Sequence, residues 1–169
     1  MISSEFRKEI SQTDIGKTIN YCYQCGTCAG ICPAFRVNSN YNPRRLVEEI
    51  LLGFKEKLLH DKNIWLCTTC HGCLEVCPQG VMVSEMLFEL RHKAVEVGNM
   101  PESIREEGVR FSQTGLNIPP SAAIGRRREK LGLNAQIMTP IVENIKILLE
   151  EVDFFKLIEN KNQEAESNE

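Results

Sequence analysis

The chain has 169 residues, a formal net charge of −3 at pH 7 and a pI near 5.7. With 42% hydrophobic and 25% charged residues it has the composition of a globular protein of one compact unit with additional segments, which excludes a disordered or fibrous chain. Nucleic acids and anionic lipids attract basic surfaces, so the acidic balance predicts neither as a partner. No apolar run reaches the roughly 18 residues of a membrane helix, and residues 1–10 lack the apolar core of a signal peptide. We therefore expect a cytoplasmic protein without a membrane partner.

The eight cysteines form two runs of identical spacing. Residues 1–20 precede the first run and are expected to be an N-terminal arm. Each run reads C-x2-C-x2-C-x3-C-P, the bacterial ferredoxin pattern, in which the fourth thiolate of each run reaches the cluster of the other run. The pattern predicts two 4Fe-4S clusters. The first is bound by Cys22, Cys25, Cys28 and Cys77, and the second by Cys67, Cys70, Cys73 and Cys32. Pro33 and Pro78 follow the runs and turn the chain away without donating a hydrogen bond.

Structural zinc and disulfides are the alternatives for these cysteines. Paired C-x2-C elements also bind zinc, but four ligands per ion do not explain the third and fourth cysteines at equal offsets in both runs. Disulfides require an oxidising compartment, for which the sequence offers no export signal. A zinc-stapled interaction module without redox chemistry stays open at this point.

Between the runs, Asn42 and Pro43 are typical of the cap and first residue of a helix. Apolar residues then recur every four positions, at Leu46, Ile50, Phe54 and Leu58. This period predicts one helix that joins the two runs.

Further helices are expected after the second run. The pattern predicts helices over residues 84–97 and 101–111, the latter directing Ile104 inward, then a loop over 115–121 and a short helix that ends near Gly132. Residues 140–158 predict an amphipathic helix that could dock on a partner, with its apolar stripe at Val142, Ile145, Leu149 and Val152. The polar residues 160–169 are expected to fray.

The expected fold class is therefore mostly α. A helical two-cluster ferredoxin domain would occupy residues 21–114, and residues 115–169 would form a C-terminal helical extension of linker, partner-docking helices and tail. The sequence shows no sustained strand alternation, no Ser-His-Asp set and no phosphate-binding glycine loop, so we expect no catalytic residue in this chain.

Several single residues near the clusters have two interpretations. His71 could tune a cluster potential, but an exposed loop side chain is favoured. Trp65 could shield a cluster or pack on the helical spacer. For Tyr21 and Tyr23, which flank Cys22, shielding of a cluster is favoured over a redox role. The basic run Arg126, Arg127, Arg128 and Lys130 favours a solvated helix face over a docking patch.

Residues 15–130 resemble a known family. The two cysteine runs, the spacer that begins at Asn42-Pro43, CGTC at residues 25–28 and CTTCHGC at residues 67–73 are together similar to the iron-sulfur C subunit of the heterodisulfide reductases of methanogens. The resemblance implies a non-catalytic member of an oxidoreductase complex. In that role the chain would pass electrons from the flavin-containing A subunit to the cysteine-rich catalytic B subunit, which reduces the heterodisulfide of coenzymes M and B.

The resemblance also implies a larger complex with a hydrogenase or a formate dehydrogenase that carries out flavin-based electron bifurcation. Related helical ferredoxin modules occur in quinone-linked dehydrogenases, so the iron-sulfur protein of such an enzyme is the alternative within the redox class.

Overall fold

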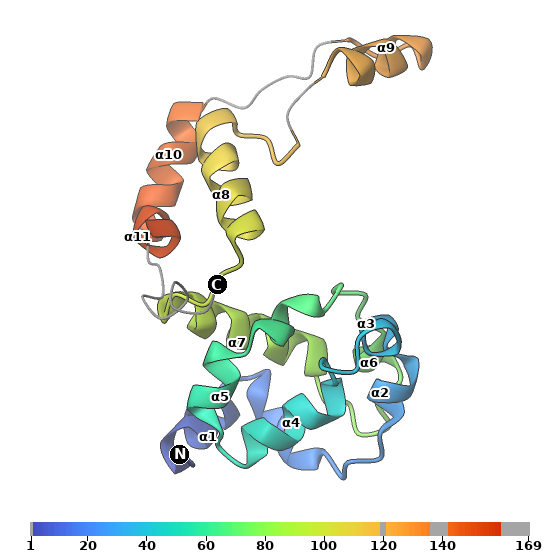
Figure 1. The fold of residues 1–169 in the computed structure, drawn as a ribbon, viewed down its shortest axis with the longest axis vertical. Helices are drawn as coiled ribbons and strands as arrows, with labels where there is room; N and C mark the ends of the chain where they lie inside the picture. Colours follow the sequence, from blue (N-terminus) through green and yellow to red (C-terminus); the bar gives the residue numbers. More distant parts are fainter. Residues whose placement is uncertain (1, 119–120, 136–141, 160–169) are drawn as a thin grey trace, which may run out of the picture. The chain divides into compact units, whose positions relative to one another are not determined.

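A computed structural model of the chain describes residues 2–118, 121–135 and 142–159, and no strand occurs among them (Figure 1). The described residues form two compact units, one within residues 2–99 and one within residues 100–159. The elements of the first unit are α1 (Ser4–Ser11), the 3-10 helix η1 (Gly16–Tyr21), α2 (Thr27–Ile31), α3 (Pro33–Val37), α4 (Pro43–Leu51), α5 (Lys55–His60), the 3-10 helix η2 (Lys62–Leu66), α6 (Gly72–Glu75) and α7 (Val83–Glu96). This architecture confirms the mostly α fold class.

The first unit has one hydrophobic core, to which both its N-terminal and C-terminal helices contribute. Phe6 and Ile10 of α1 are 1% exposed, as are Ile50 of α4 and Leu58 of α5, and Leu90 of α7 is fully buried. Full burial of one such side chain stabilises a fold by about 1.5–3 kcal/mol. The predicted N-terminal arm therefore contains a helix that packs into this core. The division of the chain into functional domains at residues 20 and 114 stays a prediction.

The apolar stretch predicted as a single helix between the cysteine runs is divided into two helices, α4 and α5, so the single helix predicted from the sequence is wrong. Asn42 caps α4 as expected, since its Oδ1 accepts hydrogen bonds from the N–H groups of Arg44 and Arg45 at 3.0 and 3.2 Å. The helix ends at Leu51 because Gly53 adopts a left-handed φ of 74°. At Gly53 the chain also meets the start of α1, where the Ser3 N–H donates to the Gly53 carbonyl at 2.8 Å.

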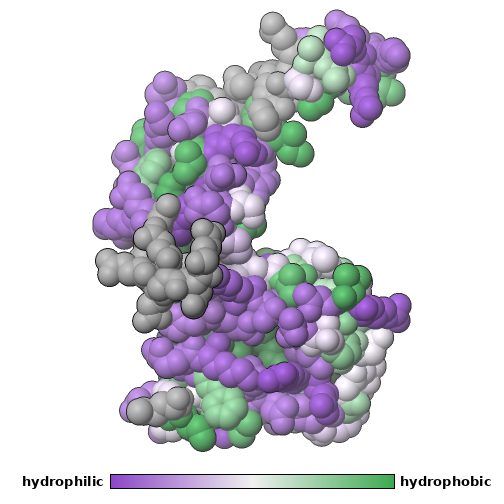
Figure 2. Space-filling view, in the orientation of Figure 1, coloured by the Kyte–Doolittle hydropathy of each residue, from purple (hydrophilic) through white to green (hydrophobic). Residues whose placement is uncertain are grey.

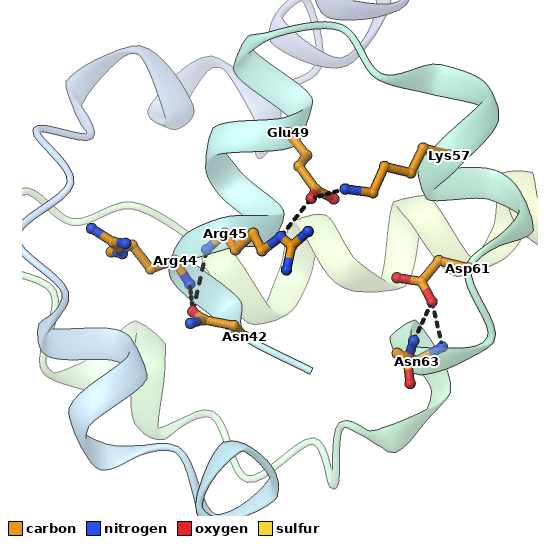
Figure 3. A network of polar contacts seen from close by, with 7 residues as sticks. All are labelled: Asn42, Arg44, Arg45, Glu49, Lys57, Asp61 and Asn63. Carbon is orange, nitrogen blue, oxygen red and sulfur yellow. Dashed lines mark hydrogen bonds and ion pairs between the residues drawn. The ribbon is translucent and has the colours of Figure 1, made fainter. Parts of the chain in front are cut away.

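A buried carboxylate links the two spacer helices (Figure 3). Glu49 of α4 is 7% exposed and accepts hydrogen bonds from Arg45 Nε at 2.9 Å and from Lys57 Nζ of α5 at 2.5 Å. Two cations therefore neutralise this buried charge and hold α5 against α4.

The long helix after the second run is confirmed. Predicted over residues 84–97, α7 covers Val83–Glu96 and is followed by Gly98 at a φ of 79°. Asn99 then fixes the end of the unit, because its Nδ2 donates to the Leu59 carbonyl at 2.7 Å.

The second unit contains α8 (Glu102–Thr114), α9 (Ala122–Lys130), α10 (Val142–Glu151) and α11 (Phe154–Glu159). The predicted helices at α8 and α9 are confirmed, and Gly132 follows α9 with a φ of 71°. The described residues of the predicted loop, 115–118 and 121, are not helical. Residues 119–120 of that loop lie outside the described residues.

Two predictions for the second unit are wrong. Ile104 is 41% exposed rather than buried, although it lies on the same face of α8 as Gly108 and lines a hollow with Phe154 of α11. α11 packs closest to α8 at Gly108, where an added Cβ would lie 3.1 Å from Phe154 Cζ. The helix predicted over residues 140–158 is two helices, since Asp153 has a left-handed φ of 53° between α10 and α11.

The predicted docking stripe lies mostly within the second unit. α10 contacts α8, and the side chains of Val142, Ile145 and Leu149 are half-buried, whereas Val152 is 64% exposed. Residues 140–141 and the predicted frayed tail, 160–169, lie outside the described residues.

Candidate metal centre

The two cysteine runs fold alike. Every cysteine of the second run lies 45 positions after its equivalent in the first, as Cys67 does after Cys22. Left-handed residues recur at the same offset: Gln24 (φ 62°) matches Thr69 (φ 52°), and Gly26 (φ 83°) matches His71 (φ 56°). Three of these four are not glycine, although a left-handed conformation costs a side chain about 1–2 kcal/mol. The stored strain indicates that the loop shape itself is required in both runs.

These loops direct N–H groups at cysteine sulfurs. The backbone N–H groups of Phe35, Thr69 and Val81 donate to the Sγ atoms of Cys32, Cys67 and Cys77, at 3.4, 3.4 and 3.2 Å. The side-chain Nε2 of Gln24 donates to Cys22 Sγ at 3.4 Å. Such donors stabilise a thiolate, which is the form of cysteine that binds metal.

One cavity gathers the four cysteines predicted for the first cluster. Cys22, Cys25, Cys28 and Cys77 all line it, so the cavity combines three cysteines of the first run with the fourth of the second. Apolar residues complete the wall, namely Val47, Pro78, Val81 and Val83. Burial raises the pKa of the Cys28 thiol to about 11, so this thiol holds its proton at neutral pH until a metal displaces it.

The second predicted set also lies together. Burial is the largest cause that raises the pKa of the Cys73 thiol, and the nearby charges of Cys67, Cys32 and Cys70 raise it further. A hydrogen bond from the buried Ser84 hydroxyl acts in the opposite direction and lowers that pKa. The fourth cysteine of the first run, Cys32, therefore lies beside the second run.

The gathered thiols do not form a one-ion site. Within the described part of the chain, no three His, Cys, Asp or Glu side chains are placed to hold a single metal ion. In a 4Fe-4S cluster each of the four cysteine thiolates binds a different iron, so the four cysteine sulfurs need not surround a single point. The donor set of four thiols with N–H groups aimed at the sulfurs fits such a cluster, while the assignment of the eight cysteines as ligands stays a prediction.

Both sets lie between the core and the surface. Cys32 belongs to the buried core, and Cys22, Cys67, Cys73 and Cys77 pack against it. Cys25 and Cys70, which are equivalent in the two runs, are exposed. The surface around α2, α3 and α6 is less hydrophilic than the rest of the face of the first unit seen in Figure 2. Each set therefore has a protected side and an accessible side.

The His71 side chain is 43% exposed in a loop, as the favoured interpretation expects, but it also has partners within the fold. Its Nδ1 lies 3.1 Å from Ser84 Oγ and 3.2 Å from Glu85 Oε1, and its ring stacks on Phe88. These contacts connect the left-handed loop position of His71 to α7.

The tyrosines and the basic run lie at the surface. Tyr21 and Tyr23 are 62% and 60% exposed, and a hydrogen bond with Cys25 raises the pKa of Tyr23. Arg126 and Arg127 of α9 are exposed, in agreement with a solvated face, while Arg128 Nε donates to the Asn134 carbonyl at 2.7 Å.

Two residues beside the second set were not predicted from the sequence. Tyr41 is 4% exposed, and burial together with the charge of Cys67 raises its pKa. Arg91 donates to the Cys67 carbonyl at 3.0 Å and lies over the Trp65 ring, 5.1 Å from its centroid. The only signal for Arg91 was its position, four residues after Leu87, at the border of the apolar stripe of α7.

Comparisons with known proteins agree with this geometry. Residues 18–81 match the family model of the 4Fe-4S dicluster domain. The chain is 38% identical, over 91% of its own length and 84% of the relative's, to the iron-sulfur C 2 subunit of the CoB–CoM heterodisulfide reductase of Methanocaldococcus jannaschii. The chain belongs to the family of iron-sulfur C subunits of heterodisulfide reductase.

Two further relatives extend the comparison. The C subunit of the H2:CoB-CoM heterodisulfide,ferredoxin reductase of Methanothermobacter marburgensis is 32% identical over 89% of this chain and 80% of its own. The C2 subunit of the H2/formate:CoB-CoM heterodisulfide,ferredoxin reductase of Methanococcus maripaludis is 32% identical over 83% of this chain and 78% of its own. The relatives are thus subunits of an oxidoreductase. None of the described helices of this chain is long and apolar enough to cross a membrane.

Proposed function

We propose that this chain is the electron-transfer subunit of a cytoplasmic heterodisulfide reductase complex. It would receive electrons one at a time from the flavin-containing A subunit and pass them to the catalytic B subunit, which reduces the heterodisulfide of coenzymes M and B. Membership of the C subunit family supports this role. The names of two relatives, which include H2 or formate as reductant, support a larger complex with a hydrogenase or a formate dehydrogenase.

One observation carries the proposed ligand assignment, namely the cavity shared by three cysteines of the first run and the fourth of the second. A set confined to one run would have left Cys77 with Cys67, Cys70 and Cys73. We therefore assign one 4Fe-4S cluster to Cys22, Cys25, Cys28 and Cys77, and the other to Cys67, Cys70, Cys73 and Cys32.

A 4Fe-4S cluster takes up and releases one electron at a potential that its surroundings set. The residues of this chain supply those surroundings. The N–H groups of Thr69 and Val81 stabilise negative charge on the Cys67 and Cys77 sulfurs. The apolar wall formed by Val47 and Val83 limits access of water to the first site. Exposed Cys25 gives that site one side that a redox partner can approach.

The chain has no site for the heterodisulfide under this assignment. Reduction of the heterodisulfide adds two electrons and two protons and yields two thiols, which requires a centre that holds the cleaved sulfur. All eight cysteines of the sequence are used as cluster ligands, so none is left as a nucleophile. The chemistry would take place on the catalytic B subunit.

Metal analysis is the first test of the proposal. Protein purified without oxygen should contain about eight irons and eight acid-labile sulfides per chain, because two complete sets of four thiolates are available. Zinc without labile sulfide would favour the interaction module instead. Co-purification with a flavoprotein and a cysteine-rich protein, rather than with a membrane protein, separates this role from a quinone-linked dehydrogenase.

Exchange of the fourth cysteines tests the ligand assignment. Cys32→Ser should alter the spectrum of the cluster held by Cys67, Cys70 and Cys73, and Cys77→Ser should alter the spectrum of the other cluster. Cys22→Ser and Cys67→Ser serve as matched controls, since each assigns the signal of its own run. If Cys32→Ser changes the same signal as Cys22→Ser, each run binds its own cluster and the assignment is wrong.

A further inference from the structure

Arg91 of α7 carries a positive charge to the second set of cysteines. Its guanidinium donates to the Ile64 carbonyl from Nε at 3.2 Å and from Nη2 at 2.9 Å, and Nη2 also donates to the Cys67 carbonyl at 3.0 Å. The Trp65 ring lies against the same guanidinium. These contacts fix the cation at the start of the second cysteine run.

The surroundings of Arg91 are poor in water. The residue is half-buried, it lies over the ring of half-buried Trp65, and it is close enough to Tyr41, which is 4% exposed, to interact with it electrostatically. Three hydrogen bonds to carbonyls compensate the loss of water without neutralising the charge, since carbonyls carry no net charge. A charge in such a position acts more strongly on its neighbours than one in bulk water.

The first set offers a contrast. Arg44 lines its cavity, but the residue is exposed. Water and salt screen an exposed charge, so Arg44 should have a weaker effect on its site than Arg91 has on the second.

We propose that Arg91 raises the reduction potential of the cluster bound by Cys67, Cys70, Cys73 and Cys32 through its fixed positive charge. This inference rests on the proposed function, since it requires that these cysteines hold a cluster. Reduction adds one negative charge to the cluster, and a nearby cation stabilises the reduced form more than the oxidised form. Arg91 is a positioning residue in this role, because it acts on the potential and contacts no substrate.

The test compares substitutions that differ in charge. Arg91→Gln removes the charge, Arg91→Lys keeps the charge but loses the planar fork of donors, and Arg44→Gln is the exposed control at the other cluster. Redox titrations of the purified chain, followed by electron paramagnetic resonance, give the potential of each cluster. Arg91→Gln should lower the equilibrium constant for reduction of the second cluster at least tenfold, which is about 59 mV for one electron.

Arg91→Lys should restore most of the wild-type potential of the second cluster, and the first cluster should titrate as in the wild type in both variants. Arg44→Gln should leave the second cluster unchanged and shift the first by less than Arg91→Gln shifts the second. Equal shifts in Arg91→Gln and Arg91→Lys would overturn the proposal, because the hydrogen bonds and not the charge would then set the potential. An unchanged potential in Arg91→Gln would overturn it as well.

Iron analysis of each variant separates a change in the potential of the second cluster from loss of that cluster. Arg91→Met keeps the apolar stem over Trp65 and replaces Arg91→Gln if that variant binds fewer irons than the wild type. If both uncharged variants lose the second cluster while Arg91→Lys retains it, Arg91 serves assembly of the site and the proposal fails. A wild-type chain without iron and labile sulfide would instead contradict the proposed function, so the two failures are distinguishable.

Discussion

Gly53→Ala tests why the predicted helix between the cysteine runs is divided into α4 and α5. Gly53 is buried with a φ of 74°, and a Cβ atom at this position would lie 2.3 Å from the Ser3 carbonyl oxygen. Gly80→Ala is the matched control in the same unit, because Gly80 has a φ of 63° but no heavy atom within 4 Å of its added Cβ. The two substitutions therefore share the backbone cost and differ in the collision.

The difference between the two variants follows from the structure. An L-residue in the left-handed conformation costs about 1–2 kcal/mol, which applies to both. In Gly53→Ala the segments around Ser3 and residue 53 must move apart by about 1 Å before the added Cβ and the Ser3 carbonyl oxygen reach an ordinary contact distance. This breaks the hydrogen bond from the Ser3 N–H, worth about 1 kcal/mol. It also loosens Phe6, whose full burial contributes about 1.5–3 kcal/mol. We expect Gly53→Ala to destabilise the unit by about 2 kcal/mol more than Gly80→Ala.

Thermal unfolding of the cluster-loaded protein measures this difference. Circular dichroism without oxygen, at one heating rate for all variants, gives apparent midpoints that can be compared even where unfolding is irreversible. At roughly 4–8 °C per kcal/mol for a domain of this size, the midpoint of Gly53→Ala should lie at least about 8 °C below that of Gly80→Ala. Coincident midpoints would refute the reasoning, since the contact between Gly53 and Ser3 would then not restrain the fold.

Three further changes have defined outcomes. Glu49→Gln should lower the thermal midpoint by the equivalent of about 1–2 kcal/mol, because it weakens two charge-assisted hydrogen bonds to half-exposed cations. The control Glu56→Gln, at an exposed side chain, should have no effect on the midpoint. Equal midpoints in the two variants would contradict the role of the Glu49 contacts. The rate of cluster assembly from apoprotein, iron and sulfide should rise from pH 7 to pH 9. Burial raises the pKa of Cys28 to about 11, and a ligand thiol must lose its proton to bind iron, which a higher pH makes easier. If the assembly rate, followed by absorbance, does not change with pH, deprotonation of Cys28 does not limit assembly. Leu148→Asp changes a side chain of α10 that is 67% exposed, and it should leave the iron content unchanged but weaken assembly with partner subunits, measured by size-exclusion chromatography. Full assembly of this variant would show that α10 does not dock on a partner.

Local patterns predicted the parts of the fold that depend on neighbouring residues. The cap at Asn42, the apolar period of α7 and the paired spacing of the cysteines are all short-range signals, and the corresponding elements occur in the structure. Gly53 lies inside a four-residue apolar period that continues to Leu58, so the local sequence predicts one uninterrupted helix. The end of α4 involves contact with Ser3, fifty residues away, which no local pattern reveals.

The candidate site divides in the same way. Cysteine spacing predicts which thiols share a cluster, because the fourth thiolate of each run reaches the other cluster in this pattern, and this ligand assignment stays a prediction. The contributions of Arg91 and Ser84 arise when α7 packs beside the second run. An arginine at the border of an apolar stripe usually lies at the surface, so its sequence position did not predict a half-buried cation beside the second run.

Turnover with a strong reductant and the heterodisulfide tests the relay role most directly. The isolated chain with both clusters loaded should accept electrons but reduce no heterodisulfide, and turnover should appear when the catalytic B subunit is added. Turnover should fall again when a cysteine substitution removes either cluster from an assembled complex, as determined by iron analysis. Substantial turnover by the isolated chain would contradict the account, because one of its clusters would then be a catalytic centre.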